Sequence, residues 1–364
     1  MAVKKSGYPV EFAEDAFGES PVLAEMLKAV TASASPRILI VADQNVVQRT
    51  EGLGSKIGRY VQKHGIALAA SPVVLVGGEK IKADNLQSAL RVVSALLEAR
   101  LGSDGCVVAI GGGTLLDIAG YAASQVRGGV KLLRLPTTPA AMMDAAFADY
   151  AAVDSYSVKD ALRVRSVPAG VVIDVTFAKT VLDGVWRGGF GEAVRQAVAV
   201  DATLLKKLAA LAPDYCARKP EALAEVVGLT VASRLKKGST TFAGWITARL
   251  ESMSGYKLPH GYAVAIGVCV ELAYAVERGL VKAKDAEQAR GLLAACGALD
   301  GLAHSRHLLG QADQVLDGLA AWRLTTADAG VVLPTGLGKS SVEEPDVETY
   351  RTVLKSFVSS PAEA

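Results

Sequence analysis

Hydrophobic residues in the first half of the chain gather in short apolar runs, separated by longer stretches of helical periodicity. Short apolar runs bounded by turn residues are typical of buried strands, and they cover residues 8–12, 37–43, 72–76, 106–110, 131–135 and 171–174. The helical periodicity predicts helices over residues 21–32, 53–64, 85–99 and 114–125. Strands that alternate with helices favour a parallel sheet covered by helices.

The pattern changes near residue 177. Beyond it, apolar residues recur at helical spacing in segments rich in Ala, Leu and Val, without further strand signals. The sequence therefore predicts an α/β domain over residues 1–176 and an all-helical domain over residues 177–364. The length of 364 residues also favours two domains.

The strand predicted at residues 106–110 runs directly into three glycines, Gly111 to Gly113, and a helical pattern follows. A helix N-terminus attracts anions, and glycines let a phosphate approach the backbone closely. The stretch therefore predicts a phosphate or dinucleotide site, with an ordinary strand-to-helix turn as the alternative. Asp43, Gly78 and Thr137 stand at the ends of other predicted strands, where ligands of parallel sheets bind, and they favour the ligand site.

Composition restricts the classes of partner. A hydrophobic content of 51%, a charged content of 21% and a net charge of +2 are typical of a globular enzyme and give no reason to expect nucleic acid or a membrane as partner. The first residues lack the apolar core of a signal peptide. The four cysteines form no CxxC pair and are expected to be buried thiols in a reducing cytoplasm.

Six short motifs follow one another in a fixed order. They are Asp43-Gln-Asn-Val, Gly78-Glu79-Lys80-Ile-Lys82, Gly111-Gly-Gly-Thr-Leu-Leu-Asp117, Leu135-Pro-Thr-Thr138, Gly191-Glu192-Ala and His260-Gly-Tyr-Ala-Val-Ala-Ile-Gly267. As a set, from about residue 8 to 355, the order resembles the sugar phosphate cyclases, whose best-known member is dehydroquinate synthase. The resemblance is nearest to the EboD-like branch.

The resemblance implies an N-terminal NAD-binding domain, a C-terminal helical metal domain and a site between them. Members of the family oxidise a sugar-phosphate hydroxyl with NAD, eliminate phosphate, reduce the ketone again and close a carbocycle. A divalent metal such as Zn²⁺ or Co²⁺ polarises the oxygen, and cationic groups hold the substrate. The resemblance also implies a homodimer.

The resemblance assigns most nucleotide contacts to the first domain. Asp43 matches the acid at the adenosine ribose. The other matched positions are Gly78, Glu79, Lys82, Gly112, Gly113, Thr114, Asp117, Thr137, Thr138, Lys159, Phe177 and Thr180.

The metal site matches less well. Glu192 and His260 stand at two of the three ligand positions, but Gly244 stands at the third, and two protein ligands hold a divalent ion weakly. Asp144 or a water could complete the site. Alternatively, His260 and Glu192 could be a hydrogen-bonded structural pair.

Several catalytic positions also depart from the family. The candidate catalytic residues are Asp144, Lys159, Arg195 and His260. Arg195 replaces a lysine, Tyr150 replaces another, and Tyr262 replaces a glutamate. Three further departures are Asp154 in place of an asparagine, Ala248 in place of a histidine, and a shortened loop between Lys237 and Thr241.

These departures leave three hypotheses open. The first is a divergent cyclase, a carbon–oxygen lyase that does not make dehydroquinate. The second is a pseudoenzyme with a binding role. The third is a metal-free NAD-dependent enzyme for an alcohol or polyol, with Tyr150 or Tyr262 as acid or base. The other histidines, His64, His304 and His307, are expected at the surface.

Overall fold

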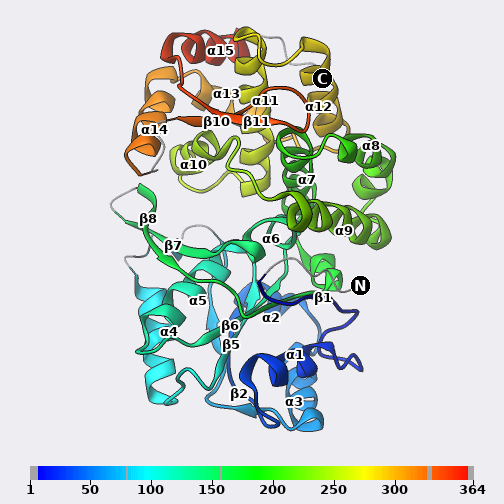
Figure 1. The fold of residues 1–364 in the computed structure, drawn as a ribbon, viewed down its shortest axis with the longest axis vertical. Coiled ribbons are helices and arrows are strands. Elements are labelled where there is room, and N and C mark those ends of the chain that lie inside the picture. Colours follow the sequence, from blue (N-terminus) through cyan, green and yellow to red (C-terminus); the bar gives the residue numbers. More distant parts are fainter. Residues whose placement is uncertain are drawn as a thin grey trace. The chain divides into compact units, whose positions relative to one another are not determined.

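The computed structural model describes residues 7–78, 81, 82, 84, 86–155, 158–325 and 330–359. The chain forms two compact units, Met1–Val181 and Leu182–Ala364 (Figure 1). The division falls a few residues after the boundary that the change of pattern suggested.

A sheet of parallel strands forms the centre of the first unit. The strands follow the order β1 (Val10–Phe12), β9 (Gly170–Ile173), β6 (Lys131–Pro136), β5 (Cys106–Gly111), β2 (Arg37–Asp43) and β3 (Ala67–Leu68), and β4 (Val73–Leu75) also pairs with β2. Each of these pairings is parallel. The parallel sheet predicted from the alternating pattern is therefore confirmed.

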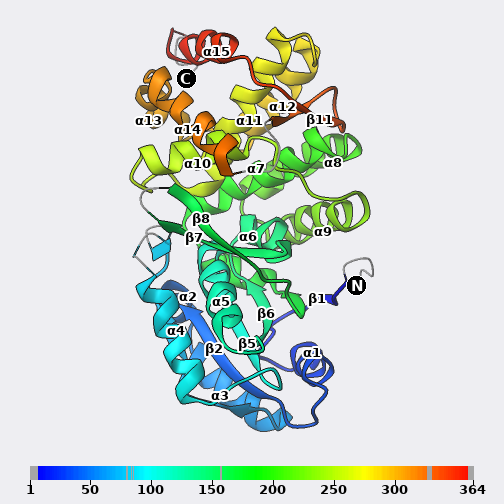
Figure 2. The ribbon, with the colours of Figure 1, turned by 60° about the vertical axis from the view of Figure 1, so that its left-hand side comes forward.

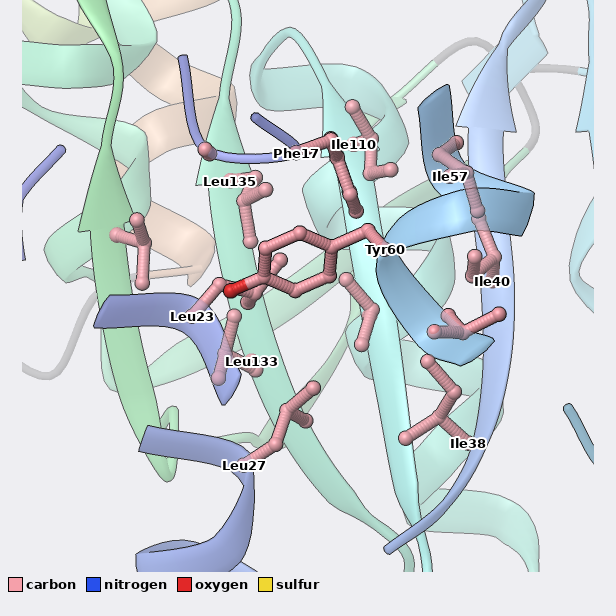
Figure 3. Close-up of a cluster of buried hydrophobic side chains, with 14 of the residues drawn as sticks. Phe17, Leu23, Leu27, Ile38, Ile40, Ile57, Tyr60, Ile110, Leu133 and Leu135 are labelled. Carbon is pink, nitrogen blue, oxygen red and sulfur yellow. The ribbon is translucent and has the colours of Figure 1, made fainter. Parts of the chain in front are cut away.

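Helices cover both faces of this sheet (Figure 2). Alternate strand residues such as Ile38, Ile40 and Leu133 meet α1 (Val22–Thr31) and α3 (Leu53–His64) in one buried cluster (Figure 3). Tyr60 lies at its centre, where its hydroxyl donates to the Ser20 carbonyl at 2.9 Å. The opposite face packs against α5 (Gly113–Gln125), which also contacts α4 (Gln87–Glu98).

The connections reverse direction between β2 and β5. The chain leaves β2 through α2 (Gln44–Arg49) and α3 toward β3 and β4, whereas it leaves β5 through α5 toward β6. Such a switch point is where open α/β sheets bind ligands, at the carboxyl ends of the strands. It brings the end of β2 beside the glycine turn after β5.

An antiparallel hairpin was not predicted from the sequence. It joins β7 (Tyr150–Ser155) to β8 (Val158–Arg165) after α6 (Pro139–Met143) and the short η2 (Ala145–Phe147). The fully buried Arg134 on β6 fixes this region: its guanidinium donates to the carbonyls of Ala148 at 2.6 Å and Ser166 at 2.9 Å. A charge in the middle of an apolar run thus ties the hairpin to the sheet.

The second unit is mostly helical. Its helices are α7 (Asp183–Ala199), α8 (Thr203–Cys216), α9 (Pro220–Lys237), α10 (Gly244–Met253), α11 (His260–Glu277), α12 (Ala283–Ala295), α13 (Leu302–Leu309), α14 (Ala312–Thr325) and α15 (Val347–Ser359). In the described part of the chain, none of the helices is both long enough and apolar enough to cross a membrane.

The prediction of an all-helical second domain was wrong at one place. Antiparallel strands β10 (Val331–Pro334) and β11 (Ser340–Glu343) form a small hairpin, closed by a backbone hydrogen bond from Thr335 to Lys339 at 3.0 Å. Each strand is only four residues long, and the proline that ends β10 and the glycines that follow it are typical of a loop. Such a short signal is masked by the helical patterns on either side.

Helices α7 and α11 touch along their backbones because glycines line the crossing. A Cβ on Gly261 would collide with the backbone of Gly188, and a Cβ on Gly191 would lie 2.9 Å from the Gly261 carbonyl oxygen. Only glycine permits this approach. Since Gly191 precedes Glu192 and Gly261 follows His260, the crossing places those two side chains together.

Candidate functional site

The carboxyl edge of the sheet brings Asp43 and a glycine together. The Asp43 carboxylate caps α2 by accepting from the Asn45 N–H at 2.7 Å, and the side chain is half-buried. Asp43 pairs with Leu75 in the sheet, so Gly77 follows close by. A Cβ on Gly77 would collide with the Asp43 carboxylate oxygens. The absence of a side chain at Gly77 therefore leaves room for this carboxylate.

The glycine turn lies on the neighbouring strand end. β5 ends at Gly111, Gly112 is the N-cap of α5 and cannot cap it with a side chain, and the Thr137 N–H donates to the Gly111 carbonyl at 3.0 Å. A Cβ on Gly112 would lie 3.3 Å from the Thr138 methyl carbon. A turn without side chains at a helix N-terminus suits the phosphates of a dinucleotide. The predicted Gly112, Gly113, Thr137 and Thr138 thus lie together.

Lys82 and Asp117 join in a buried ion cluster. The Lys82 ammonium, on a residue only 4% exposed, lies 2.7 Å from a carboxylate oxygen of Asp117 and 2.7 Å from one of Asp160. Burial raises the pKa of Asp117 despite Lys82. Burial alone would also raise the pKa of Asp160, but Lys82 and Lys159 outweigh it and hold that pKa below its ordinary value.

Asp160 was missed in the sequence. It lies on β8, and its N–H donates to the Asp154 carboxylate at 2.9 Å across the hairpin. The pairing of β7 with β8 holds Asp160 in place, and its carboxylate meets Lys82. The fold therefore links the predicted Lys82, Asp117 and Lys159 through a carboxylate that no motif contains.

The remaining nucleotide-side predictions lie in different settings. Gly78 has a φ of +101°, which favours glycine, and Glu79 lies outside the described residues. Thr114 is buried in the first turn of α5. The Phe177 side chain is only 4% exposed within the core of the sheet, so its contact with a nucleotide would have to come from the backbone. The Thr180 hydroxyl donates to the Phe177 carbonyl at 3.1 Å.

Asp144 and Tyr150 flank η2. Asp144 separates α6 from η2, and its N–H donates to the Ala140 carbonyl at 2.9 Å. Tyr150 begins β7 beneath Arg163, whose guanidinium carbon lies 4.2 Å from the ring centre. Burial raises the pKa of Tyr150, which opposes a role as base.

In the second unit, His260 lies between two carboxylates. Its Nε2 is 3.1 Å from Glu192 Oε1 on α7, and its Nδ1 is 2.7 Å from Glu251 Oε1 on α10. Glu251 is fully buried and Glu192 is 3% exposed, whereas the His260 side chain is 36% exposed. Glu251 was not predicted, because its place beside His260 depends on how α10 packs on α11.

These carboxylates determine the charge of His260. Desolvation lowers the pKa of His260, but the charges and hydrogen bonds of Glu251 and Glu192 outweigh it and raise the pKa to about 10. The imidazole is therefore protonated near neutral pH, and both ring nitrogens donate. The other oxygen of Glu192 is also held, because Arg195 Nη2 lies 2.6 Å from Oε2.

The residues do not complete the three-ligand metal site of the family, and the sequence had already placed a glycine at its third position. Gly244 begins α10 and has no donor, and a Cβ there would lie 3.0 Å from the Trp322 ring. Within the described ranges, no group of three or more His, Cys, Asp or Glu side chains is arranged to hold a metal ion. His260 and Glu192 remain adjacent, with Arg195 and Glu251 as their further partners.

Tyr262 does not join His260. Its ring packs between Gly184 and Gly301: a Cβ on Gly184 would lie 3.2 Å from the ring, and a Cβ on Gly301 would lie 2.8 Å from it. The ion pair between Arg187 and Asp300, at 2.8 Å, lies nearby. Gly184 stands eight residues before Glu192 on α7, which is about 12 Å along a helix axis. Tyr262 is therefore a packing residue of the α7–α11 crossing.

The other histidines and the cysteines lie outside these clusters. His304 and His307 are exposed on α13, as expected, whereas His64 is partly buried against the Tyr60 ring at 4.4 Å. Cys106, Cys269 and Cys296 are buried, Cys216 is half-buried, and all four are free thiols.

Comparison with known proteins agrees with this architecture. The model of the 3-dehydroquinate synthase N-terminal domain matches residues 72–187, and that of the C-terminal domain matches residues 242–308. The 3-dehydroquinate synthase of Pyrobaculum islandicum is 30% identical over 278 residues, which cover 70% of this chain and 79% of that protein. The chain belongs to the 3-dehydroquinate synthase-like family of sugar phosphate cyclases.

Other relatives cover more of the chain at lower identity. The 3-dehydroquinate synthase of Nostoc punctiforme is 28% identical over 337 residues, 88% of this chain and 90% of that protein. A structure of 2-epi-5-epi-valiolone synthase from Streptomyces hygroscopicus, with NAD⁺ and Zn²⁺ bound, has a TM-score of 0.81 at 24% identity and covers 98% of each chain. A 2-deoxy-scyllo-inosose synthase complexed with carbaglucose-6-phosphate, NAD⁺ and Co²⁺ has a TM-score of 0.77 at 17% identity, over 98% of this chain and 99% of that one. The predicted family and fold are confirmed.

Proposed function

We propose that this protein binds NAD at the carboxyl edge of its parallel sheet and acts on a phosphorylated polyol without making 3-dehydroquinate. The observation that carries the proposal is the switch point, where Asp43 and the glycine turn stand on adjacent strand ends. A carboxylate beside a phosphate-binding turn is the arrangement that recognises a dinucleotide.

Each part of this edge has a role in the proposal. Asp43 accepts hydrogen bonds from the ribose hydroxyls, and the backbone of Gly112 and Gly113 receives the pyrophosphate at the start of α5. Lys82, held by Asp117 and Asp160, keeps the hairpin close to this edge. Bound NAD would supply a hydride acceptor.

The substrate class follows from the family and from a candidate cation. The cyclase relatives include one whose structure contains carbaglucose-6-phosphate, which supports a sugar phosphate or a related polyol as ligand. Within the first unit, Lys159 is the cation that we assign to its anionic groups, with Asp144 as an acceptor for its hydroxyls.

Formation of 3-dehydroquinate is not expected. Gly244 supplies no ligand, Tyr150 stands where the family has a lysine, and only residues 238–243 connect α9 to α10. Losing a Lewis acid ligand, a cation and a loop removes groups that this reaction needs in its transition states.

A second candidate is a nucleotide-binding protein without turnover. The observation in its favour is that both nitrogens of His260 and both oxygens of Glu192 are held by neighbouring side chains. The remaining hypothesis, a metal-free polyol oxidoreductase that uses a tyrosine, receives less support, because Tyr262 packs away from His260 and burial raises the pKa of Tyr150.

The test begins with the purified protein. Mass spectrometry of released ligand and calorimetric titration measure NAD, and product analysis follows incubation with the heptulosonate phosphate and with a panel of sugar phosphates and free polyols. We expect NAD binding, no 3-dehydroquinate, and turnover of another sugar phosphate. Binding of NAD without any turnover would favour the second candidate, whereas 3-dehydroquinate formation or failure to bind NAD would refute the proposal.

A further inference from the structure

The cluster around His260 is complete without an ion. Its members come from three helices: Glu192 and Arg195 from α7, Glu251 from α10 and His260 from the start of α11. Glu192, Arg195 and Glu251 are all buried. Buried carboxylates require partners of opposite charge or hydrogen-bond donors, and here Arg195 and His260 provide them.

Arg195 stands where a metal ion would compete with it. Its Nη2 lies 2.6 Å from Glu192 Oε2, while Glu192 Oε1 faces His260 Nε2 at 3.1 Å. A divalent ion bound by Glu192 and His260 would share that one carboxylate with the guanidinium. The guanidinium already neutralises this carboxylate and would repel a second cation in so buried a place, so the ion pair weakens the hold of Glu192 on a divalent ion.

The position of the family's third metal ligand also lacks room for a side chain. Gly244 begins α10, and the space in front of its missing Cβ contains the Trp322 ring at 3.0 Å. Even a histidine at this position would have to displace an indole before it could reach an ion. Thus both the donor and the room for it are absent at this point.

We propose that Arg195 takes the place of the divalent metal, so that Glu192, His260 and Glu251 form a metal-independent centre held by the guanidinium. Arg195 is then a positioning residue: it neutralises Glu192 and keeps that carboxylate against His260. The inference concerns the same family site as the proposed function, but it depends on neither NAD binding nor turnover.

The test uses the full chain after treatment with a chelator. Zn²⁺ and Co²⁺ are titrated by calorimetry and by the absorption of bound Co²⁺, and Tm is measured with and without each ion. We expect no stoichiometric binding and no change of Tm for the native protein. Binding of one ion per chain, or a Tm that falls with chelator and recovers with Zn²⁺, would overturn the proposal.

Variants of Arg195 separate charge from packing. Arg195→Met leaves the buried Oε2 of Glu192 without its cation, so Tm is expected to fall by about 10 °C, and Zn²⁺ should now raise it again. Arg195→Lys keeps the charge and should remain indifferent to metal. A Zn²⁺ response of the lysine variant equal to that of the methionine variant would contradict the assigned role.

A double variant keeps the test informative if Arg195→Met does not fold. Glu192→Gln in the same chain removes the carboxylate that needs neutralising, so the double variant should fold, with a Tm above that of Arg195→Met and no response to Zn²⁺. If it is as unstable as the single variant, Arg195 acts through packing and the inference fails. A failure here leaves NAD binding in the first unit untouched.

Discussion

Asp43 performs two tasks, because its carboxylate both caps α2 and stands beside the glycine turn. The cap needs only a side-chain oxygen that accepts from the Asn45 N–H. Recognition of ribose hydroxyls benefits from the negative charge as well. One substitution can therefore separate the two tasks.

We expect Asp43→Asn to weaken NAD binding by about 10- to 100-fold, the value of a charge-assisted hydrogen bond, at nearly unchanged stability. Asparagine is as good an N-cap as aspartate, so the urea midpoint should stay where it is. Calorimetric titration and urea unfolding measure the two effects. Native affinity in the variant would show that Asp43 is only a cap; as a control, Asp43→Ala should lose about 1 kcal/mol of stability as well.

Glu271 is a buried acid in the second unit with no predicted role in binding. It lies fully buried on α11, accepts from the Tyr350 hydroxyl at 2.6 Å and is hydrogen-bonded by the Trp245 indole. Burial raises the pKa of Glu271 from 4.5 to about 8, against the effect of both donors. The folded protein therefore keeps a proton that the unfolded chain releases.

The sign of the pH dependence follows. Below pH 4.5 both states hold the proton; between about pH 5 and 8 only the folded state does, so the contribution of Glu271 to stability falls as pH rises. Glu271→Gln keeps an acceptor and a donor but does not titrate. As pH rises from 5 to 8, the native protein should therefore lose about 3 kcal/mol of unfolding free energy that the variant keeps. Parallel curves for the two proteins in chemical unfolding would contradict this.

At the scale of elements, the crossing of α7 and α11 decides the geometry around His260. The glycines that precede Glu192 and follow His260 are where the two backbones meet. The motifs around these residues therefore carry a packing requirement as well as functional side chains. Because the packing is this close, an atom added at either glycine would displace both helices.

Gly261→Ala should force the helices apart and cost about 2 kcal/mol or more, even after alanine's better helix propensity is counted. Gly291→Ala is the matched control: it also lies within a helix, but nothing stands within 4 Å of its Cβ position. The control should gain up to about 1 kcal/mol. Equal effects of the two substitutions in urea unfolding would show that the crossing tolerates a side chain.

At the scale of the whole molecule, the two compact units carry different chemistry. Asp43, the glycine turn, Lys82 and the hairpin belong to the first unit, whereas Glu192, Glu251 and His260 belong to the second. The predicted nucleotide contacts, from Asp43 to Thr180, all precede the division after Val181.

Hydrogen exchange on the intact chain can test this separation. NAD should slow exchange most in the peptides that contain residues 43–49, 111–116 and 137–143, since ligands protect the amides they contact or stabilise. Zn²⁺ should slow exchange in neither unit. Protection by NAD that is greatest in α7, α10 or α11 would mean that the nucleotide binds mainly to the second unit.

The amino-acid sequence alone determined the features that depend on local pattern. The apolar runs gave the parallel strands and the glycines after Ile110 gave the turn, because strand burial and glycine turns are written in consecutive residues. The family motifs placed Asp43, Glu192 and His260. Two hairpins were missed: β7 and β8 mix apolar with charged residues, and β10 and β11 are only four residues long each.

Only the tertiary structure decided which side chains meet. Asp160 joins Lys82 across a hairpin, Glu251 reaches His260 from another helix, and Phe177 turns into the core. These contacts join residues that are distant in sequence, and they depend on helix rotation and on close approach at the glycines. A pattern of consecutive residues contains no information about such directions, so the charges that surround His260 emerged only from the packed fold.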